Sequence, residues 1–392
     1  MPEREKTEEL YYQDVRQTEF DAEVLSCVAD EKAGVYRAVL NRTAFFPEQG
    51  GQKSDRGEVG GCEVFDVRVK DGVITHFLRG SLEVGTVVTG SVDWARRFDF
   101  MQQHTGEHIF SGLVHARFGY DNVGFHLSET ETQLDFSGPI PESALSEIEE
   151  AANRAVWENL PVRISIPESE ALKSLEYRSK LALTENVRIV DIPGVDRCAC
   201  CAPHLDSTGQ VGLIKLVAAM NYKGGVRLHI ACGLRALRDY GEKQKRGEEI
   251  SHLLSAKQEE IADAVHQLKQ KEAEAEARCS VLGKKLLELT AAALPAPERS
   301  RHALIFTDNA VSPSAMRETV NQLMERYSGC SAVFAGSDSE GWRFTLGSRQ
   351  VDCAALADVL RKAGFRCGGT KGFLQGSSAC PEAQIRELLR SC

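Results

Sequence analysis

The segment from Glu242 to Leu289 contains no proline and consists mainly of Glu, Lys, Gln, Ala and Leu, which are all strong helix formers. Apolar side chains recur in it at every seventh position. This composition and period predict one long helix, which the prolines in segment 294–297 terminate. We therefore interpret residues 242–292 as a long helix or coiled-coil linker. The recurring positions are Leu254, Ile261, Leu268, Ala275, Leu282 and Leu289.

The second seam position of this repeat holds three lysines, Lys257, Lys271 and Lys285. Lysine at a seam position weakens a two-stranded coiled coil, so a stable parallel dimer is not favoured. Packing of the stripe against the rest of the chain explains it as well as a weak dimer does. We keep both interpretations, with a homodimer formed through this helix or through the C-terminal part of the chain.

Residues 18–95 alternate between apolar and polar side chains, as in Glu63–Val69 and Val87–Val92. Gly, Asp and Asn interrupt these runs at short intervals, which is typical of antiparallel strands joined by tight turns. We predict a small β-barrel over residues 1–95, with a β-sandwich as the related alternative. The loop Phe46–Gln52 carries two adjacent glycines, which allow the backbone to approach another group closely. An ordinary hairpin turn is the alternative for this loop.

Residues 96–241 mix two helical patterns with several strand-like ones, which predicts an α+β fold class. The helical patterns cover Phe100–Phe118 and Ser143–Asn159. The second of them follows a proline and carries acidic residues early, as helix starts do. The strand-like runs are Val162–Ile166, Val187–Val190, Val211–Leu216 and Val226–Ile230.

Residues 300–392 predict a compact C-terminal α/β domain. Two strand-like runs, Ala303–Phe306 and Ser331–Ala335, flank a helical pattern over Ser314–Tyr327. The glycine-rich segment Cys367–Phe373 near the end is a weak phosphate-loop signal, because it matches neither full nucleotide fingerprint.

Acidic residues outnumber basic ones by 57 to 47, which gives a formal net charge of −10. This excludes a uniformly basic coat for nucleic acid but allows a local basic patch. No apolar run approaches the roughly 18 residues of a membrane-spanning helix. The first residues lack the apolar core of a signal peptide. We therefore expect a cytoplasmic protein with no membrane partner, in which disulfides are rare. Three of its 12 cysteines nevertheless crowd together at Cys198, Cys200 and Cys201.

Two segments carry residues with metal-ligand spacing. His104 and His108 are four positions apart in a predicted helix, so both imidazoles project from one face. Cys200 and His204 lie in a proline-containing turn. Three imidazoles and one thiolate suit zinc, which binds nitrogen and sulfur ligands tetrahedrally. We predict one zinc ion per chain.

Alternatives exist for these residues. A lone histidine pair at this spacing is more often a polar helix face than a metal site, and Cys198 or Cys201 can take the place of Cys200. We favour zinc because the two motifs occur together in a chain with only 10 histidines. We favour Cys200 because its spacing to His204 matches that of the histidine pair.

The helical motif also fits the inverted zinc-peptidase signature, in which Glu107, directly before His108, activates a water. That interpretation needs a third ligand, and Glu176 is the candidate. It leaves the Cys200–His204 turn without a purpose.

Taken together, the motifs resemble a known family. Thr43–Gln52 looks like a Thr-x-Phe-Tyr-x-x-x-Gly-Gly-Gln loop, His104–His108 like a His-x3-His element and Cys200–His204 like a Cys-x3-His element. Ser207–Leu213 continues the same pattern. The chain resembles the freestanding alanyl-tRNA editing proteins, relatives of the editing and C-terminal portions of alanyl-tRNA synthetase.

The resemblance implies a hydrolase that acts in trans on mischarged alanine tRNA and removes serine, and glycine as well. An alanine-sized activation pocket cannot strongly reject glycine, or serine with its extra hydroxyl, so a second site has to remove the error. Residues 96–241 are then the zinc-binding editing domain, with the loop Gln49–Gln52 over the aminoacyl end. The implied roles are zinc binding for His104, His108, Cys200 and His204, catalysis for Gln52, and substrate binding for Thr43, Gly50 and Gly51. At two positions this sequence differs from the family. Glu107 stands where the family often has a small hydroxyl residue, and we assign it to catalysis; His126 lies on the strand that usually supplies a hydroxyl or amide group, and we assign it to substrate binding.

Two of these roles have alternatives. Glu107 is either the general base for the attacking water or a partner that orients a zinc ligand. His126 either reads the serine hydroxyl or is an ordinary surface histidine. Four protein ligands also make a closed zinc site, so either one ligand yields to water or substrate, or the zinc only orders the pocket.

Mischarged alanine tRNA is the implied partner, and basic side chains are needed to meet its phosphates. The candidates are Arg96, Arg97, Arg366 and Lys371. The alternative function is a zinc-stabilised tRNA-binding module without catalysis.

Overall fold

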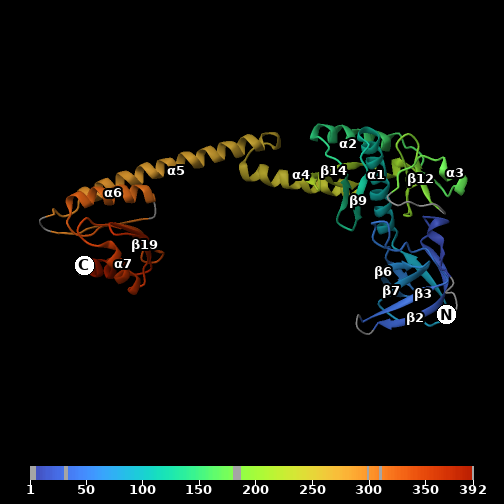
Figure 1. Cartoon of the computed structure of the whole chain (residues 1–392), viewed down its shortest axis with the longest axis horizontal. Coiled ribbons are helices and arrows are strands. Elements are labelled where there is room, and N and C mark those ends of the chain that lie inside the picture. Colours follow the sequence, from blue (N-terminus) through green and yellow to red (C-terminus); the bar gives the residue numbers. More distant parts are fainter. Residues whose placement is uncertain (1–5, 31–33, 180–186, 298–299, 309–310, 391–392) are drawn as a thin grey trace. The chain divides into compact units, whose positions relative to one another are not determined.

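The computed structural model describes residues 6–30, 34–179, 187–297, 300–308 and 311–390. The chain divides into two compact units, Met1–Arg246 and Gly247–Cys392 (Figure 1). Helices and sheets occur together in both units, which confirms the predicted α+β class. No helix of the described ranges is long and apolar enough to cross a membrane.

Six strands of the N-terminal unit close into a barrel in which every neighbouring pair is antiparallel. Along β2, the side chains of Phe20, Ala22 and Val24 are buried and those between them are exposed. The alternation in the sequence therefore turns one row of side chains into the barrel. In barrel order the strands are β2 (Glu19–Asp30), β3 (Val35–Leu40), β7 (Val73–Leu78), β6 (Cys62–Lys70), β5 (Gly57–Val59) and β8 (Val87–Val92).

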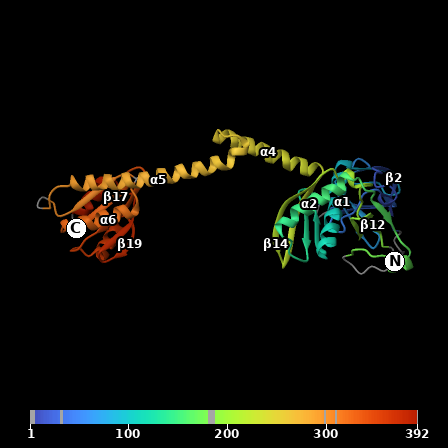
Figure 2. The same cartoon turned by 90° about the horizontal axis from the view of Figure 1, so that it is seen from above.

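Helix α1 (Trp94–Phe118) follows the last barrel strand and carries the histidine pair. It begins before the predicted Phe100 because the side chain of Asp93 caps it, accepting a hydrogen bond from Arg96 N at 3.1 Å. Helix α1 packs with α2 (Glu142–Trp157) in one core with a four-stranded antiparallel sheet. Figure 2 labels its edge strand β14. In order, this sheet contains β14 (Ile214–Tyr222), β15 (Gly225–Cys232), β10 (Thr132–Phe136) and β9 (Asn122–Leu127).

A second, three-stranded sheet carries the cysteine cluster. Its order is β11-β12-β13, and both pairs are antiparallel. Strand β13 packs against α1, so the residues that follow β13 come to lie beside the histidine pair. The remaining bounds in this unit are β11 (Arg163–Ser165), β12 (Ile189–Ile192), β13 (Asp196–Ala199), the short pair β1 (Glu8–Glu9) and β4 (Arg42–Thr43), α3 (Ser169–Lys173), and the 3-10 helices η1 (Leu10–Tyr12) and η2 (Thr208–Val211).

The C-terminal unit is built on a five-stranded sheet in the order β16-β17-β18-β20-β19. Strands β16 and β17 are parallel and are joined through α6, and the other pairs are antiparallel. Alternate residues of β17 pack on opposite faces, Val333 with α6 and Phe334 with α7 and α8. The bounds are β16 (Ala303–Thr307), β17 (Ser331–Ser337), β18 (Gly341–Gly347), β19 (Arg366–Thr370), β20 (Phe373–Ser378), α6 (Pro313–Arg326), α7 (Cys353–Lys362) and α8 (Glu382–Arg390).

The single helix predicted over residues 242–292 is wrong in one respect: the segment is broken. Helix α4 (Leu234–Leu254) ends before a short 3-10 turn, η3 (Gln258–Glu260), and α5 (Ile261–Ala292) follows. The break falls at Ser255, whose φ of 50° lies in the left-handed region that ends helices. Composition and period cannot reveal such a break, because a single residue in an unusual conformation leaves both unchanged.

The apolar residues that recur at every seventh position of α5 do not pack against the rest of the described residues of their unit. Leu268, Leu282 and Leu289 are more than half exposed. Gly283 and Leu287 are the buried residues of α5, and Leu287 joins the core under α6. A homodimer through this helix or through the C-terminal unit stays a prediction.

The glycine-rich segment 367–373 is not a phosphate loop. It forms most of an antiparallel hairpin in which Thr370 of β19 pairs with Phe373 of β20. A phosphate loop lies between a strand and a helix N-terminus, where free backbone N–H groups point at the anion. Here Gly368 and Gly369 are part of a strand ladder and Gly372 lies in the turn that follows, so no helix N-terminus follows the glycines.

A buried ion pair connects the barrel to α1. Arg97 and Asp55 are 1% and 0% exposed, and Arg97 Nε donates to Asp55 Oδ2 at 2.9 Å. The guanidinium also donates to Val15 O at 3.0 Å and to Ala44 O at 2.7 Å. Asp55 in turn accepts from Phe46 N at 2.6 Å. One side chain of α1 thus holds three separate segments of the barrel region.

We expect Arg97→Met to lower the free energy of unfolding of this unit by about 3–5 kcal/mol, because it leaves the Asp55 carboxylate buried without its partner. Arg56→Met is the control, since Arg56 is exposed and its ion pair with Glu129 contributes about 0–1 kcal/mol. Urea unfolding followed by tryptophan fluorescence measures both in a Trp342→Phe background, where the signal comes from Trp94 and Trp157. Equal destabilisation by the two variants would contradict the assignment.

Candidate metal centre

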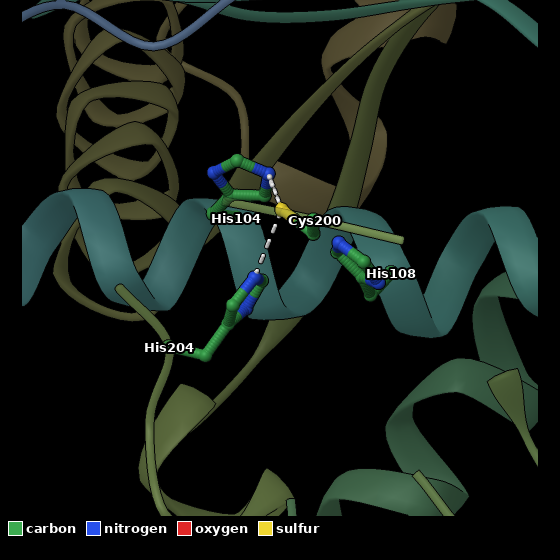
Figure 3. Close-up of side chains that lie close together, drawn as sticks. All are labelled: His104, His108, Cys200 and His204. Carbon is green, nitrogen blue, oxygen red and sulfur yellow. Dashed lines mark hydrogen bonds between the residues drawn. The ribbon is translucent and has the colours of Figure 1, made fainter. Parts of the chain in front are cut away.

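The structure brings the four predicted metal ligands together. His104 and His108 project from one face of α1, Cys200 follows β13 directly, and His204 lies in the turn beyond it (Figure 3). Their ligand atoms all lie within 4.8 Å of one another. Cys200 Sγ is 3.5 Å from His104 Nε2 and 3.3 Å from His204 Nε2. Cys200 is therefore the cysteine of this group, whereas Cys198 belongs to a different cluster with His108 and Asp196.

The outward nitrogen of each imidazole has an oxygen partner. His104 Nδ1 lies 2.7 Å from Gln52 Oε1 and His108 Nδ1 lies 2.9 Å from Asp196 Oδ2. Both oxygens only accept hydrogen bonds, so both Nδ1 atoms donate, and the Nε2 atoms are the ones turned toward the ligand group. His204 Nδ1 lies 3.3 Å from the hydroxyl of Thr105. This arrangement of outer partners is the one that orients histidine ligands in metal sites.

The charges in the cluster also suit a cation. Burial opposes ionisation of the Cys200 thiol, yet His104 and His204 hold its pKa well below the usual range. Burial lowers the pKa of His204 to about 3, so this ring is neutral. For His108 burial again opposes the charge, but the contacts with Asp196, Cys200 and Glu107 together outweigh it, and the pKa lies well above its usual value. A thiolate and neutral imidazoles are the ligand forms that bind metals, and a cation would replace the proton of His108.

A pocket of about 870 Å³ opens over the ligand group. Gly50 and Gly51 of the barrel loop form one wall, and strand β9 forms another. Gly51 has a φ of 85°, and a Cβ there would lie 2.5 Å from Phe125 O, so only glycine fits. Further lining residues are Glu9, Tyr12, Asp121, Val123, Ile166, Arg178, Ser179, Val187, Arg188, Cys198, Ala199 and Cys201.

Glu107 places a carboxylate on the pocket wall beside the ligand group. Its Oε1 accepts hydrogen bonds from Ser111 Oγ and Asn122 Nδ2, both at 2.6 Å. Its Oε2 lies 3.7 Å from His108 Nε2. Asn122 Oδ1 accepts from Gly124 N at 3.2 Å, which fixes the orientation of the amide. Glu107 is thus held rigidly at the edge of the ligand cluster.

Gln52 is buried and acts through His104 rather than lining the pocket. Its Oε1 accepts from His104 Nδ1, as described above, and it pairs with Leu127 of β9 in a parallel bridge. Its Nε2 is buried with no hydrogen-bond partner among the described residues. The loop Gln49–Gln52, predicted to lie over the aminoacyl end, therefore also orients His104, a candidate metal ligand.

Two predicted substrate-binding residues lie elsewhere. Thr43 is buried in the barrel, where its hydroxyl lies 2.8 Å from His76 Nε2, and it does not line the described pocket. His126 is on β9 next to Phe125, and neighbouring strand residues point to opposite faces. Phe125 packs against His104, so His126 points away and lies 3.9 Å from Glu131 Oε1. His126 is the partly exposed surface histidine of the alternative interpretation.

The structure also corrects several sequence-based assignments of charged residues. Arg97 is buried against Asp55 and cannot reach a phosphate, and the mostly buried Arg96 donates to Ser54 O and Glu129. Arg366 and Lys371 are exposed. Glu176, the third ligand of the peptidase interpretation, is exposed and belongs to neither metal-binding group of the described residues.

Sequence reasoning missed three residues that build the site: Asp196, Asn122 and Phe125. Asp196 holds His108 and is itself held by Arg178, whose Nε donates to Asp196 Oδ1 at 2.7 Å. Its position two residues before Cys198 was the available signal. No local signal marks Asn122, because its partner Glu107 is on another element.

The four-residue group is predicted to bind zinc, and we expect Cys200→Ala to bind much less zinc than the wild-type chain, because one thiolate ligand is removed. Cys201→Ala should keep its zinc, since Cys201 belongs to neither metal-binding group. Metal content per chain after dialysis, measured by mass spectrometry of the eluted ion, distinguishes the two. Full zinc content in Cys200→Ala would show that another residue is the ligand.

Comparison with known proteins agrees with the motifs. Residues 2–96 match the family described as tRNA synthetases class II (A), and residues 187–249 match the threonyl and alanyl tRNA synthetase second additional domain. The alanine–tRNA ligase of Pyrobaculum neutrophilum is 32% identical over 98% of this chain and 44% of its own length. That of Methanopyrus kandleri is 33% identical over the same shares. The alanyl-tRNA editing protein Aarsd1 of Danio rerio is 30% identical over 64% of each chain.

The chain spans less than half the length of the alanine–tRNA ligases that it matches. The match to them covers nearly all of the chain, and both matched families belong to tRNA synthetases. The resemblance predicted from the motifs is confirmed, and the chain is a relative of the alanyl-tRNA editing proteins and of the alanine–tRNA ligases.

Proposed function

We propose that this protein hydrolyses the ester that joins a wrong amino acid to alanine tRNA, with serine and glycine as the amino acids removed. The observation that carries the proposal is the convergence of four metal ligands, Glu107 and the Gly50–Gly51 loop on one pocket. The relatives named for alanyl-tRNA editing and alanine–tRNA ligation supply the substrate class. The pocket volume of about 870 Å³ is in the range of small-molecule sites and accommodates an aminoacylated nucleoside.

We further propose that His104, His108, Cys200 and His204 hold one zinc ion. The donor set fits the metal, because its ligand atoms are within 4.8 Å of one another and its imidazoles are oriented by outer partners. Bound there, zinc would supply Lewis-acid polarisation next to the ester.

Glu107 is the proposed general base of this site. Its carboxylate lies on the pocket wall, and its Oε1 is occupied by Ser111 and Asn122. These contacts hold the carboxylate in one orientation, so that it can take the proton of a water that attacks the ester carbonyl. The glycine loop brings its backbone close to the same space, because neither Gly50 nor Gly51 carries a side chain that would occupy it.

The direct test compares hydrolysis of alanine tRNA charged with serine, glycine or alanine. We expect the serine and glycine esters to be cleaved at least 100-fold faster than the uncatalysed reaction, which is about what a single positioned acid–base group contributes. The alanine ester should be cleaved more slowly than the serine ester. Release of labelled amino acid from each tRNA measures the three rates. Tight tRNA binding with only uncatalysed hydrolysis would favour the non-catalytic tRNA-binding module instead.

Glu107→Gln separates the role of a base from that of an orienting group. The glutamine oxygen can still accept from Ser111 and Asn122, but the side chain can no longer take a proton. We expect the rate constant for hydrolysis of the serine ester to fall about 10²- to 10⁴-fold with unchanged zinc content. Glu150→Gln, an exposed carboxylate on α2, is the control and should leave the rate unchanged. A loss smaller than tenfold would show that Glu107 only orients.

A further inference from the structure

The turn that carries Cys200 and His204 has no regular secondary structure to support it. Residues 200–204 belong to no helix or strand, and Pro203 has no backbone N–H. Carbonyl groups in such a segment need donors from elsewhere. The positions of the two candidate metal ligands in this turn therefore depend on the contacts that hold its backbone.

Two side chains from distant segments supply those contacts. Arg188 Nη1 donates to Cys200 O at 2.9 Å and to Ala202 O at 2.8 Å. Tyr12 Oη donates to Cys201 O, which lies between them, at 2.9 Å. The carbonyl groups of three successive residues in the turn therefore accept hydrogen bonds from two side chains. The backbone of Arg188 takes part as well, since its carbonyl accepts from Cys200 N at 3.0 Å.

Tyr12 and Arg188 also support each other. The guanidinium carbon of Arg188 lies 5.2 Å from the centre of the Tyr12 ring, within the distance of a cation–π contact. Tyr12 belongs to η1, and the segment just before η1 is attached to the barrel through the β1–β4 pair. Arg188 directly precedes β12. The pair therefore connects the metal-ligand turn to the barrel and to the small sheet at once.

We propose that Tyr12 and Arg188 are positioning residues for the metal centre, which set its affinity and geometry by holding the Cys200–His204 turn. This inference rests on the proposed metal site and not on the deacylation reaction. Tyr12 and Arg188 hold the backbone of the turn, whereas Gln52 and Asp196 orient the histidines of α1 through their rings. The ligands of α1 have a rigid helix beneath them, whereas three backbone carbonyls of the turn are held by these two side chains.

The test uses Co²⁺ as the probe in the full-length chain, without tRNA. Cobalt bound to a thiolate gives a charge-transfer absorption, so both affinity and ligand geometry can be followed in one titration against a competing chelator. We expect Arg188→Met to weaken binding about 100-fold, the upper end of the range for outer partners of metal ligands. Tyr12→Phe, which removes only the hydroxyl, should weaken it roughly three- to tenfold.

Conservative and distant variants separate positioning from simple loss of structure. Arg188→Lys should recover part of the affinity, because an ammonium group can still donate to a carbonyl of the turn, though it lacks the planar guanidinium that lies by the Tyr12 ring. Arg197→Met on β13 and Tyr240→Phe on α4 are the matched controls, since both side chains are exposed. Both should bind Co²⁺ like the wild-type chain. Circular dichroism verifies that every variant is folded.

The outcomes are distinguishable. Wild-type affinity and an unchanged charge-transfer band in Arg188→Met and Tyr12→Phe would overturn the positioning role alone. Failure of the wild-type chain to bind Co²⁺ would overturn the metal centre and this inference together. Weakened binding in the two variants supports the inference whether or not the protein deacylates tRNA.

Discussion

The segment from Gln52 to Asp55 contacts α1 at two points, and the position of the candidate site depends on both contacts. Asp55 pairs with Arg97, and Gln52 accepts from His104. The two helical residues are seven positions apart, so they share a face and are separated by about 10.5 Å of helix. The three residue steps from Gln52 to Asp55 span about 10 Å when extended. Because the spacings match, one buried ion pair places the glycine loop directly over the histidine pair.

The four candidate metal ligands have two kinds of support, and these supports differ in rigidity. His104 and His108 are placed by helix geometry, and their rings are oriented by Gln52 and Asp196. The other two ligands come from an irregular turn whose carbonyls are held by side chains. Barrel, helix and small sheet all contribute to one ligand group within the N-terminal unit. The fold thus brings together residues that are far apart in the chain.

The errors of prediction have physical causes. His126 was assigned to the serine hydroxyl because the resembling family places a polar residue on this strand, whereas the alternation of strand side chains turns Phe125 toward the pocket. Arg97 was a candidate for phosphate contact, yet the same charge is buried against Asp55. A single residue, Ser255, breaks a segment whose composition and period are helical throughout. Neither the burial of Arg97 against Asp55 nor the left-handed conformation of Ser255 is visible in the local sequence pattern.

The sequence by itself predicted the four candidate metal ligands, the α+β class and the resemblance to the alanyl-tRNA editing proteins, because these rest on local patterns. Residues four apart on a helix share a face, a Cys-x3-His turn is short, and strand alternation is visible within a few residues. Only the tertiary structure decided which side chains hold those ligands. Gln52, Asp196, Tyr12 and Arg188 act on residues of other segments. Such partners meet through long-range packing, whose geometry no local period or spacing encodes.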